Sequence, residues 1–194
     1  MAHLCIVVDA CVLCSTMKRH LLLSFAEAGL FSIYWSDQLL DETEGAIKVI
    51  LNKRDHDAAE DHAREVRRLM NLAFPESTVN ANSRLETSIG KLPDENDRHV
   101  IATAIKARAD IIVTENLKDF PKKVLANFGL KAQASDAFIA DMIDLYPDIA
   151  MNVVQLLMQR FRLSANTPGV LLDCMERTLL TQSVAQLKQQ IASQ

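Results

Sequence analysis

The stretch Leu92–Pro121, LPDENDRHVIATAIKARADIIVTENLKDFP, decides the fold of this chain. Apolar residues recur at helical spacing through VIATAI, and Asp94 ahead of them is a good N-cap. We therefore predict a helix from about Glu95 to Arg108. The acidic residues in its first turn suit the positive end of the helix dipole.

A buried strand follows this helix after a turn of only a few residues. The run Ile-Ile-Val within Asp110–Thr114 is continuous rather than alternating, which is typical of a central parallel strand covered on both faces. Asn116 and Asp119 come just past its carboxyl end. Sites in open α/β sheets form at that edge, so the stretch predicts a polar site there.

The N-terminal half supplies two more segments of the same kind. Leu4–Val8 predicts a first buried strand that ends in Asp9, and Phe31–Trp35 predicts a second strand followed by a helix. Asp9 is either a helix N-cap or a functional carboxylate, and its position alone slightly favours the cap.

Two glutamates flank the apolar stripe of the helix that follows the second strand. Glu44 lies four residues before Lys48 and can form an exposed ion pair with it, whereas Glu42 has no such partner. Helical periodicity alone does not choose between these two glutamates as a functional acid.

The chain has 194 residues, of which 49% are hydrophobic, so it can bury one substantial core and a small helical appendage. No run approaches the roughly eighteen uncharged apolar residues of a membrane span, and the start resembles a strand rather than a signal peptide. We therefore expect a cytoplasmic protein with no membrane segment. The net charge of −4 argues against an indiscriminate nucleic-acid binder but leaves room for local basic patches.

Cys11 and Cys14 form a C-x-x-C pattern just after the first strand. Such a pair is found in thiol redox proteins and in halves of zinc sites, but no second C-x-x-C or H-x-x-H completes a tetrahedral site. Two small apolar residues at a strand-to-helix junction are the simpler interpretation.

After Pro121 the strand signals fade, and three helical patterns follow, the last starting at Thr167 and Pro168 with threonine as its cap. We expect a polar turn at 52–57 as well. The chain thus divides into an α/β domain at 1–134 and a helical C-terminal extension at 135–194.

Acidic groups in three places would meet at one edge of a parallel sheet: Asp9, Glu42, and the group Asp94, Asp97 and Asp119. Converging carboxylates need a cation or protons to neutralise them, and oxygen ligands select Mg²⁺ or Mn²⁺. Such ions activate water for phosphodiester hydrolysis, which indicates a nuclease. Thr114 and Asn116 are candidates for positioning the water or orienting a ligand.

The order of motifs VVDA (from Val7), WSDQLLDE (ending at Glu42), FPES (from Phe74), LPDENDRHVIATAI and IIVTENLKDFP resembles the PIN domain, specifically the branch with VapC-type toxin ribonucleases. The resemblance covers about residues 3–130 and is strongest in the last two motifs. It implies a PIN-like three-layer α/β fold, with a central parallel sheet flanked by helices, and an Mg²⁺ or Mn²⁺ site that cleaves RNA.

The resemblance also selects residues. The family's acids fall on Asp9, Glu42, Asp97 and Asp119, with Asp94 as an adjacent acid, so it favours Glu42 over Glu44. Many PIN domains have an aspartate two residues after the threonine, where this chain has Asn116, which puts the strength of a second metal position in question.

The leading hypothesis is a metal-dependent ribonuclease, the toxin of a toxin–antitoxin pair, with RNA as substrate, a cognate antitoxin as partner and a homodimer as the expected assembly. Candidates for steering backbone phosphate are Arg19, Arg98, His99 and Lys118, each of which also fits an ordinary surface position. The alternatives are a catalytically inactive PIN-like interaction module and a thiol redox protein that uses Cys11 and Cys14.

Overall fold

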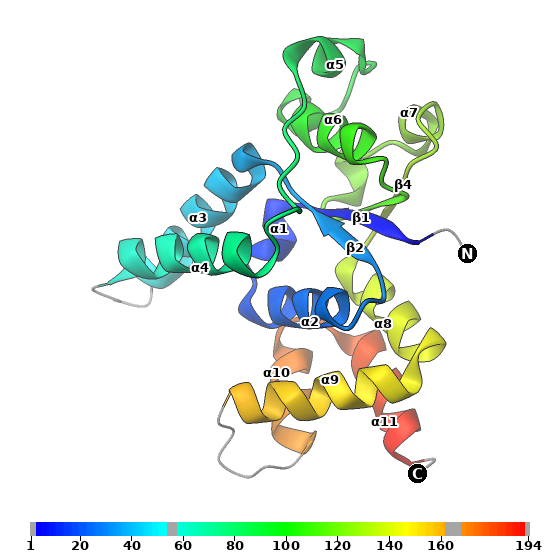
Figure 1. Ribbon diagram of the computed structural model, residues 1–194. Coiled ribbons are helices and arrows are strands. Elements are labelled where there is room, and N and C mark those ends of the chain that lie inside the picture. The colour runs from blue at the N-terminus through cyan, green and yellow to red at the C-terminus, as the bar shows by residue number, and fades with distance from the viewer. Residues whose placement is uncertain (1–2, 54–57, 162–167, 193–194) are drawn as a thin grey trace. The chain divides into compact units, whose positions relative to one another are not determined.

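The computed structural model of the protein describes residues 3–53, 58–161 and 168–192 (Figure 1). The expected cap Thr167 and most of the expected turn at 52–57 lie outside these residues. The chain forms two compact units, Met1–Cys14 with Ser32–Gln133, and Ser15–Phe31 with Ala134–Gln194. Compared with the division proposed at 134/135, the second unit gains the segment Ser15–Phe31.

The first unit is built on a sheet of four parallel strands in the order β2-β1-β3-β4. The strands are β1 (Cys5–Val8), β2 (Ser32–Tyr34), β3 (Ile111–Val113) and β4 (Lys131–Gln133). Ile6 of β1 and Ile112 of β3 are fully buried, as continuous apolar runs in central strands predict. The α/β fold with a central parallel sheet is confirmed.

The strand β4 is absent from the sequence-based prediction, which expected no strand after Pro121 and was wrong there. Its three residues are Lys131, Ala132 and Gln133, and only Ala132 is apolar. An edge strand pairs on one side only and needs no continuous apolar run, so backbone pairing with β3 forms it without a hydrophobic signal.

Helices follow or connect the strands of this unit: α1 (Ala10–Leu13), α3 (Asp37–Asn52), α4 (Ala59–Ala73), α5 (Ser83–Ser88), α6 (Arg98–Ala107) and α7 (Lys122–Ala126), with 3₁₀ turns η1 (Glu95–Asp97) and η2 (Leu117–Asp119). The helix predicted from Glu95 is confirmed, although its first turn is η1. Asp94 caps it, since its carboxylate accepts the Asn96 N–H at 2.9 Å. Arg108 ends it in the left-handed conformation, with φ 53°.

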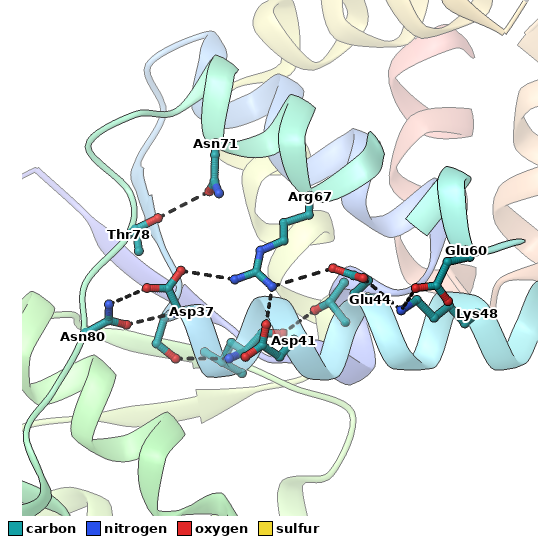
Figure 2. Close-up of polar contacts among 12 residues, drawn as sticks. Asp37, Asp41, Glu44, Lys48, Glu60, Arg67, Asn71, Thr78 and Asn80 are labelled. Carbon is teal, nitrogen blue, oxygen red and sulfur yellow. Dashed lines mark hydrogen bonds and ion pairs between the residues drawn. The ribbon is translucent and has the colours of Figure 1, made fainter. Parts of the chain in front are cut away.

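The helices α3 and α4 lie side by side and are joined by a ladder of ion pairs (Figure 2). Arg67 of α4 reaches three carboxylates of α3, with Asp37 at 3.3 Å, Glu44 at 3.7 Å and Asp41 also in contact. The predicted pair between Glu44 and Lys48 is confirmed at 2.9 Å. Arg67 therefore separates three like charges that would otherwise repel one another.

Replacing Arg67 with methionine should lower the free energy of unfolding by about 1 kcal/mol, because three partly exposed carboxylates lose a shared counter-ion. Arg68→Met is the matched control, since Arg68 is 61% exposed and, among the described residues, its ion pair is with Glu65 of its own helix. We expect a clearly smaller loss there, because solvent screens an exposed pair. Urea unfolding at low and high salt measures both. Equal losses in the two variants would contradict the role of Arg67.

The second unit is all helical, with α2 (Thr16–Glu27), α8 (Ser135–Leu145), α9 (Pro147–Arg160), α10 (Pro168–Arg177) and α11 (Thr181–Ala192). Four described helices stand where the sequence predicted three patterns after residue 135. The helix α2 packs on α9, where Arg160 donates to Glu27 at 3.1 Å. Rings of Phe31 and Phe138 meet edge to face, with centroids 5.2 Å apart.

Asp136 is a buried acidic residue of this unit and is only 8% exposed. Its carboxylate accepts the backbone N–H groups of Gln182 and Ser183, each at 2.9 Å, and the Ser183 hydroxyl at 2.8 Å. These donors belong to the first turn of α11. One carboxylate of α8 therefore satisfies the free N–H groups at the start of another helix. Among the described residues, the helices are all too short or too polar to cross a membrane.

Candidate active site

The carboxyl ends of β1 and β3 bring Asp9 and Thr114 into direct contact. The Thr114 hydroxyl donates to Asp9 Oδ2 at 2.7 Å, and both side chains are buried, with exposures of 6% for Asp9 and 0% for Thr114. Asp9 occupies the N-cap position of α1, but its side chain makes no capping bond. The slight preference for a cap is therefore wrong, because the carboxylate binds across the sheet instead.

Cys11 adds a second donor to the same carboxylate. Its Sγ lies 3.1 Å from Asp9 Oδ2 and accepts the Glu115 N–H at 3.3 Å, which ties the turn after β3 to the start of α1. Burial, together with the negative charge of Asp9, raises the pKa of the Cys11 thiol to about 12.

A thiol that stays protonated at neutral pH is a poor nucleophile, so this geometry speaks against the thiol redox alternative. The Cys14 thiol donates to the backbone carbonyl of Cys11 at 3.4 Å, and neither cysteine forms a disulfide. The C-x-x-C pattern pointed to Cys11 and Cys14 as a pair. It did not predict that Cys11 by itself donates to Asp9. Its position two residues after Asp9, at a strand-to-helix junction, was the available signal.

The pKa of Asp97, in η1, is affected by the charges of the other acids. Burial raises its pKa to about 6, and the negative charges of Asp9, Asp94 and Asp119 add to the effect, while His99 opposes it. Acids from the end of β1, from η1 and from η2 therefore share one electrostatic environment at the carboxyl edge of the sheet. Asp94 also caps η1, since its side chain accepts the Asn96 N–H.

Glu42 and Glu44 of α3 have different surroundings. Glu42 Oε1 lies 2.9 Å from His99 Nε2 and accepts the Gln38 side-chain amide at 3.4 Å, while Glu44 is engaged by Lys48 and Arg67. The contact with His99 directs Glu42 towards α6, the helix that η1 begins. Periodicity could not separate the two glutamates, because it carries no information on these partners.

Three of the four basic candidates for phosphate contact are engaged elsewhere. His99 is 6% exposed and contacts Glu42, and its buried Nδ1 has no hydrogen-bond partner in the described part of the chain. Arg98 pairs with Glu95 and donates to carbonyl groups at the end of α5. Arg19 is 4% exposed and belongs to the second unit. Lys118, exposed on η2, is the candidate that faces solvent.

The turn after β3 is ordered by its own hydrogen bonds. The Asn116 N–H donates to Thr114 Oγ1 at 3.0 Å, and the Asp119 N–H donates to the Asn116 carbonyl at 2.9 Å. Thr114 thus links Asp9 to Asn116, and Asn116 in turn sets the start of the turn that carries Asp119. The side chain of Asn116 itself is exposed.

The acids fit a hard divalent cation in their chemistry, because all their donor atoms are carboxylate oxygens. In the part of the chain that the structure describes, no three His, Cys, Asp or Glu side chains are grouped closely enough to hold one ion. Like charges at one sheet edge repel one another, as the raised pKa of Asp97 reflects. The acids would have to approach one another to share a cation.

Comparisons with known proteins match both parts of the chain. The family model described as "PIN domain" matches residues 5–118, and the one described as "VapC50 C-terminal domain" matches residues 135–189. A Mycobacterium tuberculosis protein named "Putative ribonuclease VapC50" is 39% identical over 79 residues, which are 41% of this chain and 47% of the relative. The chain thus aligns with about half the length of that relative. No solved structure matches.

Proposed function

Because the chain belongs to the PIN domain family, we propose that it is a metal-dependent endoribonuclease that hydrolyses RNA phosphodiester bonds. Asp9, Asp97 and Asp119 carry this proposal, since separate segments bring them to the carboxyl edge of one parallel sheet. A fixed carboxylate among further acids is the arrangement that a metal-dependent nuclease needs. The similarity to a protein named as a ribonuclease adds support.

The residues that would hold the cation, Mg²⁺ or Mn²⁺, are Asp9, Glu42, Asp97 and Asp119. When bound, the ion would supply an activated water and would neutralise charge that develops on the phosphate. Asp94 and Asn116 would serve as outer groups.

The chain's own contribution is to orient the acids before RNA arrives. The Thr114 hydroxyl and the Cys11 thiol both donate to Asp9 Oδ2, so these two contacts leave Oδ1 of the same carboxylate unused. His99 holds Glu42 through Oε1 alone. Ligands fixed by hydrogen bonds of this kind need little reorganisation on binding, which favours catalysis.

We further propose that the protein is the toxin of a toxin–antitoxin pair, with a cognate antitoxin as partner and a homodimer as its assembly. The support is the pairing of a PIN domain match with a VapC50 C-terminal domain match in one chain. Residues 135–189 include α8 and most of α11, so the helical unit is the part to test for partner binding.

Removing divalent cations should stop RNA cleavage, and Mn²⁺ or Mg²⁺ should restore it, because the acids cannot act on a phosphodiester without a counter-ion. The assay uses the full chain after treatment with EDTA, and calorimetry measures cation binding independently of activity. Glu42→Gln should weaken binding, while the control Glu44→Gln should not, since Glu44 is held by Lys48. Undiminished cleavage in EDTA would refute the proposal. A folded protein that binds no divalent cation would favour the inactive interaction module.

A further inference from the structure

Two groups of basic side chains in the first unit differ in their partners. Those on α3 and α4 are paired with acids, as Arg67 is with Asp37 and Lys48 is with Glu60 at 2.8 Å (Figure 2). A second group, exposed between η2 and β4, forms no ion pair with any residue that the structure describes. Its members are Lys118, Lys122, Lys123 and Lys131. Four lysines without an ion pair to any described residue thus lie within residues 118–131.

A cavity of about 570 Å³ lies between α7 and β4 among these lysines. Lys122 and Lys131 line it together with Leu125 and Leu130, which are only 1% and 4% exposed. Gly129 also lines it, and nothing lies within 4 Å of the position that its Cβ would take. The cavity therefore combines an apolar wall with positive charge, which suits a flat apolar group attached to an anion.

The cavity begins close to the candidate active site. Gln133 lines it, and the Gln133 carbonyl accepts the Thr114 N–H at 3.0 Å, while Thr114 holds Asp9. The strand β4 is two places from β1 in the sheet, so the two strands lie roughly 10 Å apart at the usual spacing. That separation is short enough for one RNA strand to occupy both places.

We propose that single-stranded RNA leaves the acids over η2 and α7, with its phosphates on Lys118, Lys122 and Lys131 and one unpaired base in the cavity between α7 and β4. This inference rests on the proposed ribonuclease function. It adds that the RNA is single-stranded and that it extends from the acids towards α7 and β4. Lysines bind phosphate without regard to sequence, and an apolar cavity accepts a base that is not stacked in a duplex. Paired bases could not enter the cavity.

Fluorescence anisotropy of a labelled single-stranded RNA, with EDTA present to prevent cleavage, tests the lysines. Lys122→Glu and Lys131→Glu should each weaken binding by about tenfold and reduce the salt dependence by about 0.7 in log–log slope. Lys106→Glu is the matched control, because Lys106 is an exposed lysine on α6 that does not line the cavity. It should change affinity by less than about twofold.

The cavity needs its own variant, Ala126→Phe, since Ala126 is exposed on α7 and lines the cavity. A filled cavity should weaken RNA binding by about fivefold, the lower range for one lost base contact. Inorganic polyphosphate, which has the charge of RNA but no bases, should bind Ala126→Phe like wild type and bind both lysine variants poorly. Circular dichroism checks that each variant is folded.

Equal RNA affinity in Lys122→Glu, Lys131→Glu and Lys106→Glu would overturn the path, even if the wild type cleaves RNA. An equal loss of RNA and polyphosphate binding in Ala126→Phe would overturn the base site. RNA binding that depends on these lysines, without metal-dependent cleavage, would support the path and refute the proposed activity. The two proposals therefore fail in distinguishable ways.

Discussion

Asp97→Asn should abolish RNA cleavage, with a loss of about 10³-fold or more, and should stabilise the folded protein at neutral pH. The loss of activity follows from the proposed role of Asp97 as a metal ligand beside Asp9 and Asp119. The gain in stability follows from the raised pKa of Asp97, which means that its charge is unfavourable in the fold. A structural residue would not show both effects.

The pH dependence of this gain has a definite sign. The pKa of Asp97 rises from 3.8 to about 6 on folding, so the folded state binds the proton more tightly than the unfolded state. Stability therefore falls as pH rises through this interval, and the ionised carboxylate carries its full penalty above it. Because Asp97 is partly exposed, solvent screening reduces the penalty to about 1 kcal/mol. Asparagine mimics the protonated acid and should remove that penalty.

Urea unfolding without divalent cations, at a series of pH values, measures the effect. Asp97→Asn should be more stable than wild type by about 1 kcal/mol above pH ~6, with the difference vanishing below pH ~4. Glu95→Gln is the control, and it should be less stable than wild type at neutral pH. The reason is that the Leu92 N–H and Arg98 stabilise the ionised carboxylate and so lower the pKa of Glu95. A pH-independent difference, or cleavage retained by a folded Asp97→Asn, would contradict the assignment.

Sequence reasoning succeeded where local pattern and burial coincide. The apolar runs of β1 and β3, and the cap at Asp94, follow from short stretches whose neighbours in sequence decide the outcome. It failed at β4, where backbone pairing rather than side chains forms the strand. It also failed at Asp9, whose partner Thr114 lies 105 residues away.

The basic residues show the same limit. Arginine is usually a surface residue, so the sequence suggested that Arg19 and Arg98 were exposed. In the structure Arg19 is buried, and Arg98 links η1 to the end of α5. Only tertiary contacts distinguish them from Lys118, which remains exposed. For the acids, the order of motifs favoured Glu42 over Glu44. The structure adds a reason, because Glu44 already forms ion pairs with Lys48 and Arg67.

Asp136→Ala should lower the free energy of unfolding of the helical unit by about 3 kcal/mol. Its carboxylate is buried and is the acceptor for two backbone N–H groups and two hydroxyls, those of Thr181 and Ser183, at the start of α11. Alanine leaves these donors without that acceptor, and each buried unsatisfied donor costs about 1–3 kcal/mol, partly relieved where water can enter. The loss of negative charge at a helix N-terminus adds to the effect.

Hydrogen exchange at Gln182 and Ser183 locates this loss, because these are the amides that donate to Asp136. Both should exchange faster in Asp136→Ala, and urea unfolding should show the lower stability. Asp144→Ala is the matched control, since Asp144 lies exposed on the same helix and should change stability by no more than about 0.5 kcal/mol. Unchanged protection of the two amides in Asp136→Ala would show that α11 does not depend on this carboxylate, and the C-terminal helices would then owe their packing to apolar contacts alone.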